Sequence, residues 1–302
     1  MDVAGPVQSV VRSDGSNIDL AVFEYGDRSN PTMVLLHGWP DTHLLWDEVA
    51  TKLADRFHVV TYDQRGHGES TSPQSWRDFS FAELCTDLLA VINDTSPDSP
   101  VHLVGHDFGA MYAWDAICDS RFDGRVASFS CVAGTNLDLW GTFARETIRR
   151  PTPRRLVGLS SQLVCSSYIF SLFVPGFPRV AFNTLGKPKV WTRVLRTISA
   201  VSPGEAVLAP SLVSDMNSGV RIYRANLSKL FRPRRRHTAV PVQMVTAKYD
   251  VAIRRIPLSD APQWADTVNF REVAGGHWLP MTHSEEIAKL AVDFAIVHSS
   301  PN

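Results

Sequence analysis

The stretch VHLVGHDFGA, residues 101–110, decides the fold that this sequence predicts. Its apolar first half is typical of a buried strand, and its last residues favour the start of a helix. Gly105 and Gly109 flank the centre with the spacing of the sharp turn that presents a nucleophile between a strand and a helix. The central residue is Asp107, where such turns often carry serine. The sequence therefore predicts a carboxylate nucleophile, with helix capping as the plainer interpretation of the same aspartate.

Strands and helices alternate along most of the chain. Strands are expected at residues 7–12, 18–25, 32–36, 57–62, 101–104, 126–132, 240–246 and 268–273. Helices are expected at residues 44–53, 81–92, 108–118, 256–264 and 284–297. The first two strands favour a hairpin, and the apolar runs that follow are of the kind that parallel sheets bury between helices. The alternation predicts an α/β fold with a parallel sheet and helices on both of its faces.

Residues 135–237 interrupt this alternation and have no clear strands. Helical patches are expected around residues 155–173, 190–200 and 216–230. The interruption is too long for a loop, so it predicts a helical cap (lid) inserted into a core domain of residues 1–134 and 238–302. The cap is strongly basic, with 17 Lys and Arg against 4 Asp and Glu, whereas the rest of the chain has 13 against 27.

Four segments follow strands whose carboxyl ends meet at one edge of a parallel sheet, where open α/β sheets bind ligands. Besides the turn described above, they are HGWP at residues 37–40, then Asp250 and His277 after the last two strands. The order nucleophile, acid, histidine predicts that His277 activates water and that Asp250 orients it. The backbone N–H groups of Trp39 and Phe108 are the expected oxyanion-hole donors. The plainer interpretation of HGWP is an ordinary turn, and that of His277 is a histidine with a structural role only.

These segments also carry a family resemblance. They are HGWPDTHLLW, YDQRGHGES, GHDFGA, TAKYD and GGHW, at residues 37–46, 62–70, 105–110, 246–250 and 275–278. Together they resemble the α/β-hydrolase-fold epoxide hydrolases, including epoxide hydrolase-like modules of actinobacterial proteins, over essentially the whole chain. The resemblance implies the α/β-hydrolase fold with an inserted helical cap. It also implies conversion of an epoxide plus water to a vicinal diol through an ester on Asp107, without a cofactor.

Two cap tyrosines narrow the chemistry within this resemblance. Tyr168 in YIFSLFVPG and Tyr223 in RIYRAN stand in segments that resemble those carrying the family's paired epoxide-binding tyrosines. An epoxide oxygen gains alkoxide charge as the ring opens, and two phenol O–H groups aimed at it stabilise that charge. Packing within the cap is the plainer interpretation of both residues. The other cap aromatics, expected either in an apolar pocket or in the cap core, are Phe143, Phe170, Phe173, Phe177, Phe182 and Trp191.

Two other functions remain open from the sequence. The aspartate turn alone also admits haloalkane and fluoroacetate dehalogenases. A haloalkane dehalogenase cradles halide with tryptophan N–H groups, often from the residue after the nucleophile; here that residue is Phe108, which leaves Trp39 or Trp278 for the role. The arginine of a fluoroacetate-type site is missing after Asp107. A non-catalytic binding module of the same fold is the third interpretation. His37 and His106 are expected to support the site rather than to act as its base.

Composition limits the partners that we expect. The sequence has no HExxH or GxxxxGK[ST] motif, which predicts neither a metal site nor a phosphate loop. Four cysteines without paired spacing and no secretory signal predict a cytoplasmic chain. No apolar run approaches the roughly 20 residues that span a bilayer. Modules of the resembled family can be fused to a reductase-type domain; we expect none here, because residues after 297 leave no room for one, with a fragment of a longer fusion as the alternative.

The basic cap adds a question about partners. A solvated hinge, or a surface complementary to the acidic core domain, is the favoured interpretation of its charge. Attraction to an anionic membrane or to acid-bearing epoxides is the alternative. Nucleic acid is not expected, because no recognition motif accompanies the charge. The expected partners are a small lipophilic epoxide and water, and both a monomer and a homodimer fit the sequence.

Overall fold

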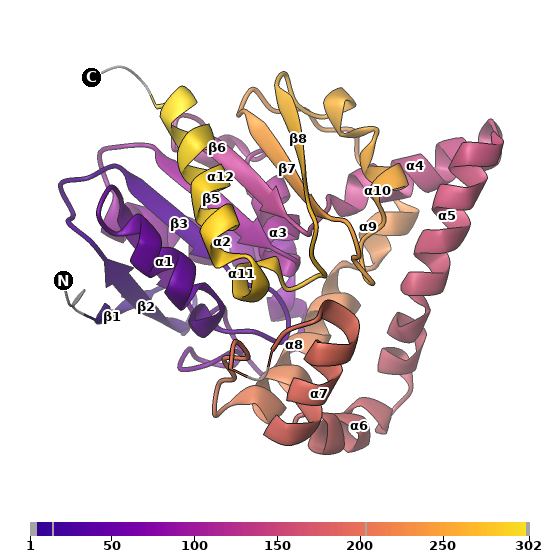
Figure 1. The fold of residues 1–302 in the computed structure, drawn as a ribbon, viewed down its shortest axis with the longest axis horizontal. Coiled ribbons are helices and arrows are strands. Elements are labelled where there is room, and N and C mark those ends of the chain that lie inside the picture. Colours follow the sequence, from indigo (N-terminus) through magenta and orange to yellow (C-terminus); the bar gives the residue numbers. More distant parts are fainter. Residues whose placement is uncertain (1–4, 14, 203, 300–302) are drawn as a thin grey trace.

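The computed structural model describes residues 5–13, 15–202 and 204–299 and is built around one sheet (Figure 1). Among these residues the sheet has eight strands in the order β1-β2-β4-β3-β5-β6-β7-β8. The strands are β1 (Val7–Arg12), β2 (Asp19–Tyr25), β3 (Thr32–Leu36), β4 (His58–Tyr62), β5 (Val101–His106), β6 (Val126–Val132), β7 (Val242–Ala247) and β8 (Val268–Val273). β2 pairs antiparallel with β1 and β4, and all other pairings are parallel. The predicted mostly parallel sheet is confirmed.

Helices cover both faces of this sheet, as the sequence predicts. α1 (Asp47–Leu53) and α12 (Ser284–Val297) pack against each other on the face turned toward the viewer in Figure 1. α2 (Phe81–Thr95) and α3 (Phe108–Ala116) pack against each other behind the sheet. The strands between these two layers are buried on both sides, which explains their continuous apolar sequences.

The described elements between β6 and β7 are all helical. They are α4 (Leu137–Arg149), α5 (Pro153–Cys165), η4 (Ser167–Phe173), α6 (Phe177–Leu185), α7 (Pro188–Ser199), α8 (Leu212–Asn226) and α9 (Ser228–Phe231). We call residues 135–237 the cap region; its status as a separate domain stays a prediction. Helices were expected for α5, η4, α7, α8 and α9, whereas α4 and α6 were not predicted. Figure 1 shows the cap helices beside the edge of the sheet at which β5 and β7 end.

Two sequence expectations are wrong in detail. The helix expected at 256–264 is divided into α10 (Arg255–Leu258) and η5 (Ala261–Gln263), because Pro262 cannot continue a helix that began before it.

The stretch Pro153–Phe173 has 21 residues and is long and apolar enough, by length and composition, to span a membrane. Serines and a glutamine interrupt its apolar runs, so no unbroken run was visible in the sequence. In the structure it forms α5 and η4, and most of it is exposed.

A sharp turn at Asp107 joins β5 to α3. Asp107 has φ 51° and ψ −119°, a backbone conformation that residues with side chains rarely adopt. A Cβ on Gly105 would lie 2.7 Å from the backbone nitrogen of Ala110, and a Cβ on Gly109 would overlap the backbone oxygen of Leu36. Only glycine allows strand and helix to approach this closely. The turn therefore fixes the Asp107 side chain at the end of β5.

We predict that Gly109→Ala lowers the free energy of unfolding by roughly 1–3 kcal/mol, the usual cost of overpacking. Its new methyl group would meet the backbone oxygens of Leu36 and His37, which cannot move without shifting β3. Urea denaturation measures the change. Gly5→Ala is the control, because a Cβ there meets nothing within 4 Å. Equal stability of the two variants would contradict the tight packing of this turn.

Candidate active site

The carboxylate of Asp107 faces the loop that follows β3. The backbone N–H of Trp39 donates a hydrogen bond of 3.2 Å to Asp107 Oδ1, and the Trp39–Pro40 peptide bond is cis. The backbone N–H of Phe108, at the start of α3, also interacts with this carboxylate. The two expected oxyanion-hole donors are thus brought to the same side chain. A helix N-terminus and a loop N–H together form an environment that favours negative charge on this carboxylate.

His277 lies between two buried carboxylates. Its Nε2 is 3.5 Å from Asp107 Oδ2, and its Nδ1 is 3.0 Å from Asp250 Oδ2. Asp250 is held in turn by the backbone N–H groups of Ala252 and Ile253, which donate to its Oδ1 at 2.7 and 2.9 Å. The three side chains come from the loops after β5, β7 and β8. The structure therefore brings together the residues predicted as nucleophile, acid and histidine.

This arrangement sets the charge of the three groups. Burial alone would lower the pKa of His277, but the carboxylates of Asp250 and Asp107 outweigh burial and raise that pKa to about 10. Burial would raise the pKa of Asp107, and the contact with His277 reverses this, so the pKa lies below its usual value. At neutral pH His277 is therefore an imidazolium beside the carboxylate of Asp107.

The two other predicted histidines support the loops of the site. Burial lowers the pKa of both His37 and His106 to about 4, so both are neutral. His106 Nε2 lies 3.0 Å from the carbonyl oxygen of His277, and His37 Nε2 accepts a hydrogen bond from the backbone N–H of Gln64. Among the described residues, neither ring forms a hydrogen bond with the carboxylate of Asp107. The supporting positions fit the expectation from the sequence.

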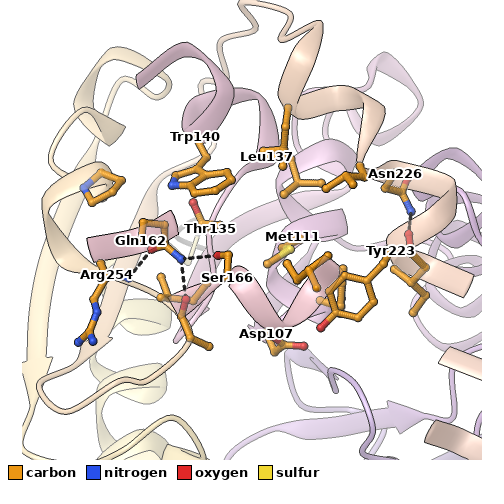
Figure 2. Close-up of a pocket in the computed structure, with 18 of the residues that line it drawn as sticks. Asp107, Met111, Thr135, Leu137, Trp140, Gln162, Ser166, Tyr223, Asn226 and Arg254 are labelled. Carbon is orange, nitrogen blue, oxygen red and sulfur yellow. Dashed lines mark hydrogen bonds between the residues drawn. The ribbon is translucent and has the colours of Figure 1, made fainter. Parts of the chain in front are cut away.

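Tyr168 and Tyr223 face each other across the same pocket. Their hydroxyl oxygens are 2.9 Å apart, and both side chains line the cavity that contains Asp107. They come from η4 and α8, and Figure 2 shows Tyr223 directly beside Asp107. Burial raises the pKa of Tyr168 to about 12 and that of Tyr223 well above its usual value. Both phenols are therefore protonated donors at neutral pH.

The rest of the pocket is mainly apolar. It also contains a few polar groups that no sequence motif marks. Its apolar lining includes Met111, Leu137, Ile169, Ile222, Leu230 and Leu258. Gln162 of α5 ties the cap to the loop after β7, because its Nε2 donates to the Ala252 carbonyl and its Oε1 accepts from the Arg254 N–H, both at 2.7 Å. A lone glutamine among the apolar and small residues of α5 was the only sequence signal for this contact.

Trp140 stands at the opposite end of the pocket from Asp107 and Tyr223 (Figure 2). Its indole Nε1 is buried and has no hydrogen-bond partner among the described residues. No sequence motif marks this tryptophan as a pocket residue.

The six cap aromatics divide into two groups. Phe143, Phe182 and Trp191 are buried in the interior, whereas Phe170, Phe173 and Phe177 are exposed. None of the six lines the pocket around Asp107. Of the two expected positions, the cap core holds for Phe143, Phe182 and Trp191, while Phe170 lines a separate apolar groove.

Comparisons with known proteins agree with this architecture. Residues 31–150 match the sequence profile described as "alpha/beta hydrolase fold". The structure of an epoxide hydrolase from Vigna radiata superposes with a TM-score of 0.73, at 20% identity, over 96% of this chain and 98% of that one. This chain has the α/β-hydrolase fold.

Curated relatives of this chain carry two kinds of name. It is 33% identical over 289 residues to "Probable oxidoreductase EphD" of Mycobacterium tuberculosis, which is 92% of this chain and 48% of that protein. It is 25% identical over 296 residues to "Epoxide hydrolase 3" of Xenopus tropicalis, which is 94% of this chain and 76% of that protein. The chain thus spans about half the length of the mycobacterial relative.

We predict that Asp107→Asn lowers the pKa of His277, because it removes one of the two carboxylates that raise it. Ring chemical shifts of isotope-labelled histidine, followed by NMR during a pH titration, measure this pKa. In the native protein the contacts of His277 contribute their full stabilisation at pH values below its unfolded-state pKa of about 6.5. That contribution is lost as the pH rises through the folded-state pKa of about 10. Thermal stability should therefore fall less steeply over this range in Asp107→Asn.

The control is Asp266→Asn, which removes a carboxylate 3.5 Å from His237 on the surface. This change should leave the pKa of His277 unaltered. A native pKa of His277 near 6.5, or one that Asp107→Asn does not change, would show that the two carboxylates do not set its charge.

Proposed function

We propose that this α/β-hydrolase converts lipophilic epoxides to vicinal diols through a covalent ester on Asp107. The observation that carries the proposal is the pair of protonated tyrosine hydroxyls, Tyr168 and Tyr223, in the same apolar pocket as Asp107 and His277. Relatives named epoxide hydrolases support it at modest identity. The mainly apolar lining suits a lipophilic substrate.

In the first step, a carboxylate oxygen of Asp107 attacks one epoxide carbon, and the bond between that carbon and the epoxide oxygen breaks. The oxygen leaves with the bonding pair and takes a proton from one of the two tyrosine hydroxyls. The second hydroxyl stabilises the charge that develops on this oxygen. The products are a hydroxyalkyl ester on Asp107 and one tyrosinate.

In the second step, water attacks the ester carbonyl. Forming the ester removes the negative charge of Asp107, so His277 loses one of the carboxylates that raise its pKa. Its proton passes to the tyrosinate left by the first step, and the neutral ring then takes a proton from the attacking water. The N–H groups of Trp39 and Phe108 stabilise the oxyanion, and Trp39 already donates to Oδ1 in the unliganded site. Collapse of this intermediate releases the diol, and the protons return so that Asp107, His277 and the tyrosine regain their starting states.

The dehalogenase alternative fits these contacts less well. The two tryptophans near the turn have their indole N–H groups bonded elsewhere: Trp39 Nε1 donates to the carbonyl of Met216 at 3.1 Å, and Trp278 Nε1 donates to Asp41 Oδ2 at 3.0 Å. Neither N–H is therefore available for a halide beside Asp107. Release of chloride or bromide from haloalkanes would favour this alternative, whereas diol formation would favour the proposal.

We predict that Tyr168→Phe/Tyr223→Phe lowers kcat for diol formation from styrene oxide by about 10²-fold or more, the typical effect of removing oxyanion donors. The loss follows because no phenol remains to protonate the opening ring. Rates are measured by chromatography of the diol. Undiminished activity in the double variant would overturn the roles of both tyrosines.

The matched control is Tyr62→Phe/Tyr112→Phe. These two buried tyrosines also have hydroxyl oxygens 2.9 Å apart, but neither lines the pocket. The folded control should retain the native turnover rate, so a loss seen only in the cap variant is a loss of chemistry and not of a tyrosine pair in general.

A single turnover in ¹⁸O-water tests the ester itself. Because water attacks the carbonyl carbon of Asp107, the first turnover should place the label in this carboxylate and leave the diol unlabelled. Mass spectrometry of the peptide that contains residue 107 detects it. Label confined to the diol of a single turnover would rule out the ester, and Asp107→Asn provides the unlabelled reference peptide.

A further inference from the structure

The outward side of α5 is apolar although it is exposed. Val157 and Val164 are 61% and 72% exposed, and they lie seven residues apart on one stripe of the helix. The buried residues of this helix are Gly158 and Gln162, so its polar amide faces inward. A surface helix ordinarily shows the reverse pattern, with its apolar residues toward the core.

This apolar surface continues along the chain beyond α5. Phe170 of η4 is 75% exposed and Val180 of α6 is 71% exposed, and Phe177 between them is also exposed. In Figure 1, α5 runs along the outer edge of the molecule and α6 lies at its lower end. We call this surface the outer apolar face and define it by Val157, Leu163, Val164, Phe170, Phe177 and Val180. Exposed apolar side chains on three successive cap elements, α5, η4 and α6, indicate an interaction site.

The chain segment that carries the outer apolar face is charged with one sign only. Between Glu146 and Glu205 the sequence contains 9 Lys and Arg and no Asp or Glu. Arg149, Arg150 and Arg154 precede α5 or begin it, are exposed, and form no ion pair with the described residues. A partner that covers this face therefore meets apolar side chains with a basic border.

An apolar groove shares lining residues both with this face and with the pocket of Asp107. Its outer rim includes Leu163 and Phe170, which belong to the outer apolar face, together with Ile148 and Phe231. Its inner part shares Trp140, Ser166, Ile169, Leu227 and Leu230 with the pocket. The groove and the pocket of Asp107 thus lie on two sides of the same lining residues.

We propose that the outer apolar face docks on the surface of an anionic membrane. Apolar side chains with a basic border are the combination that binds such surfaces, by partition of the first and attraction of the second. A second copy fits less well, because it would bring two strongly basic cap regions together. The docking does not depend on the proposed activity.

Vesicle flotation tests the docking. We expect the protein to float with vesicles of phosphatidylcholine and phosphatidylglycerol and to remain largely unbound with phosphatidylcholine alone. Val157→Glu/Val164→Glu should weaken binding by about tenfold or more, since it replaces two side chains that enter the apolar phase with two anions. The matched control is Val7→Glu/Val10→Glu on β1, whose valines are each 67% exposed. In Figure 1, β1 lies on the opposite side of the molecule from α5.

A second variant separates charge from apolar contact. Arg149→Gln/Arg150→Gln/Arg154→Gln should weaken binding to anionic vesicles by roughly fivefold per arginine at low salt. The same variant should change binding to phosphatidylcholine little. Circular dichroism shows that each variant is folded, and turnover of water-soluble styrene oxide, in the absence of vesicles, tests the proposed activity separately from docking.

Several results would overturn the proposal. These are the absence of flotation, equal binding to neutral and anionic vesicles, or an equal loss in the β1 control. A dimer in light scattering that Val157→Glu/Val164→Glu dissociates would show instead that a second copy covers this face.

Discussion

The backbone of Asp107 is the constraint on which the site depends. A positive φ is unfavourable for an aspartate, by about 1–3 kcal/mol, and it persists only where the surroundings determine it. Here α3 approaches β5 at Gly105 and the end of β3 at Gly109 so closely that no side chain fits at either glycine. The carboxylate is consequently held at the end of the strand, within reach of the Trp39 N–H and of His277. Packing of the surrounding elements thus holds Asp107 in this unfavourable backbone conformation.

The charges of the site follow from this placement. His277 is buried between Asp107 and Asp250, and each charge is tolerated there only because the others accompany it. In this cluster the positive charge of the His277 imidazolium lies between the two aspartates. Under the proposed mechanism the ester on Asp107 removes one of the two anions. The same geometry would therefore hold His277 as an acid before the first step and release it as a base for the second.

The cap region has two apolar sides with different consequences. Its inner side brings Tyr168 and Tyr223 together above Asp107, so that two donors face a pocket which is otherwise mainly apolar. On its outer side, Val157 and Val164 of α5 are exposed to solvent. α5 also has few buried residues that hold it against the rest of the protein. Gln162 compensates in part, since its amide ties α5 to the loop after β7. α5 thus lines the pocket with one side and presents exposed apolar residues on the other.

The sequence by itself determined the α/β order, the turn at Asp107 and the loops that carry Asp250 and His277. It could do so because buried parallel strands are continuous apolar runs and because glycine spacing marks a tight turn, and both signals are local. Tertiary structure alone decided the contact between Tyr168 and Tyr223, the position of Trp140 in the pocket and the outward direction of the α5 valines. These features depend on how amphipathic helices with similar sequence patterns rotate and pack against one another, and helical periodicity does not specify that rotation.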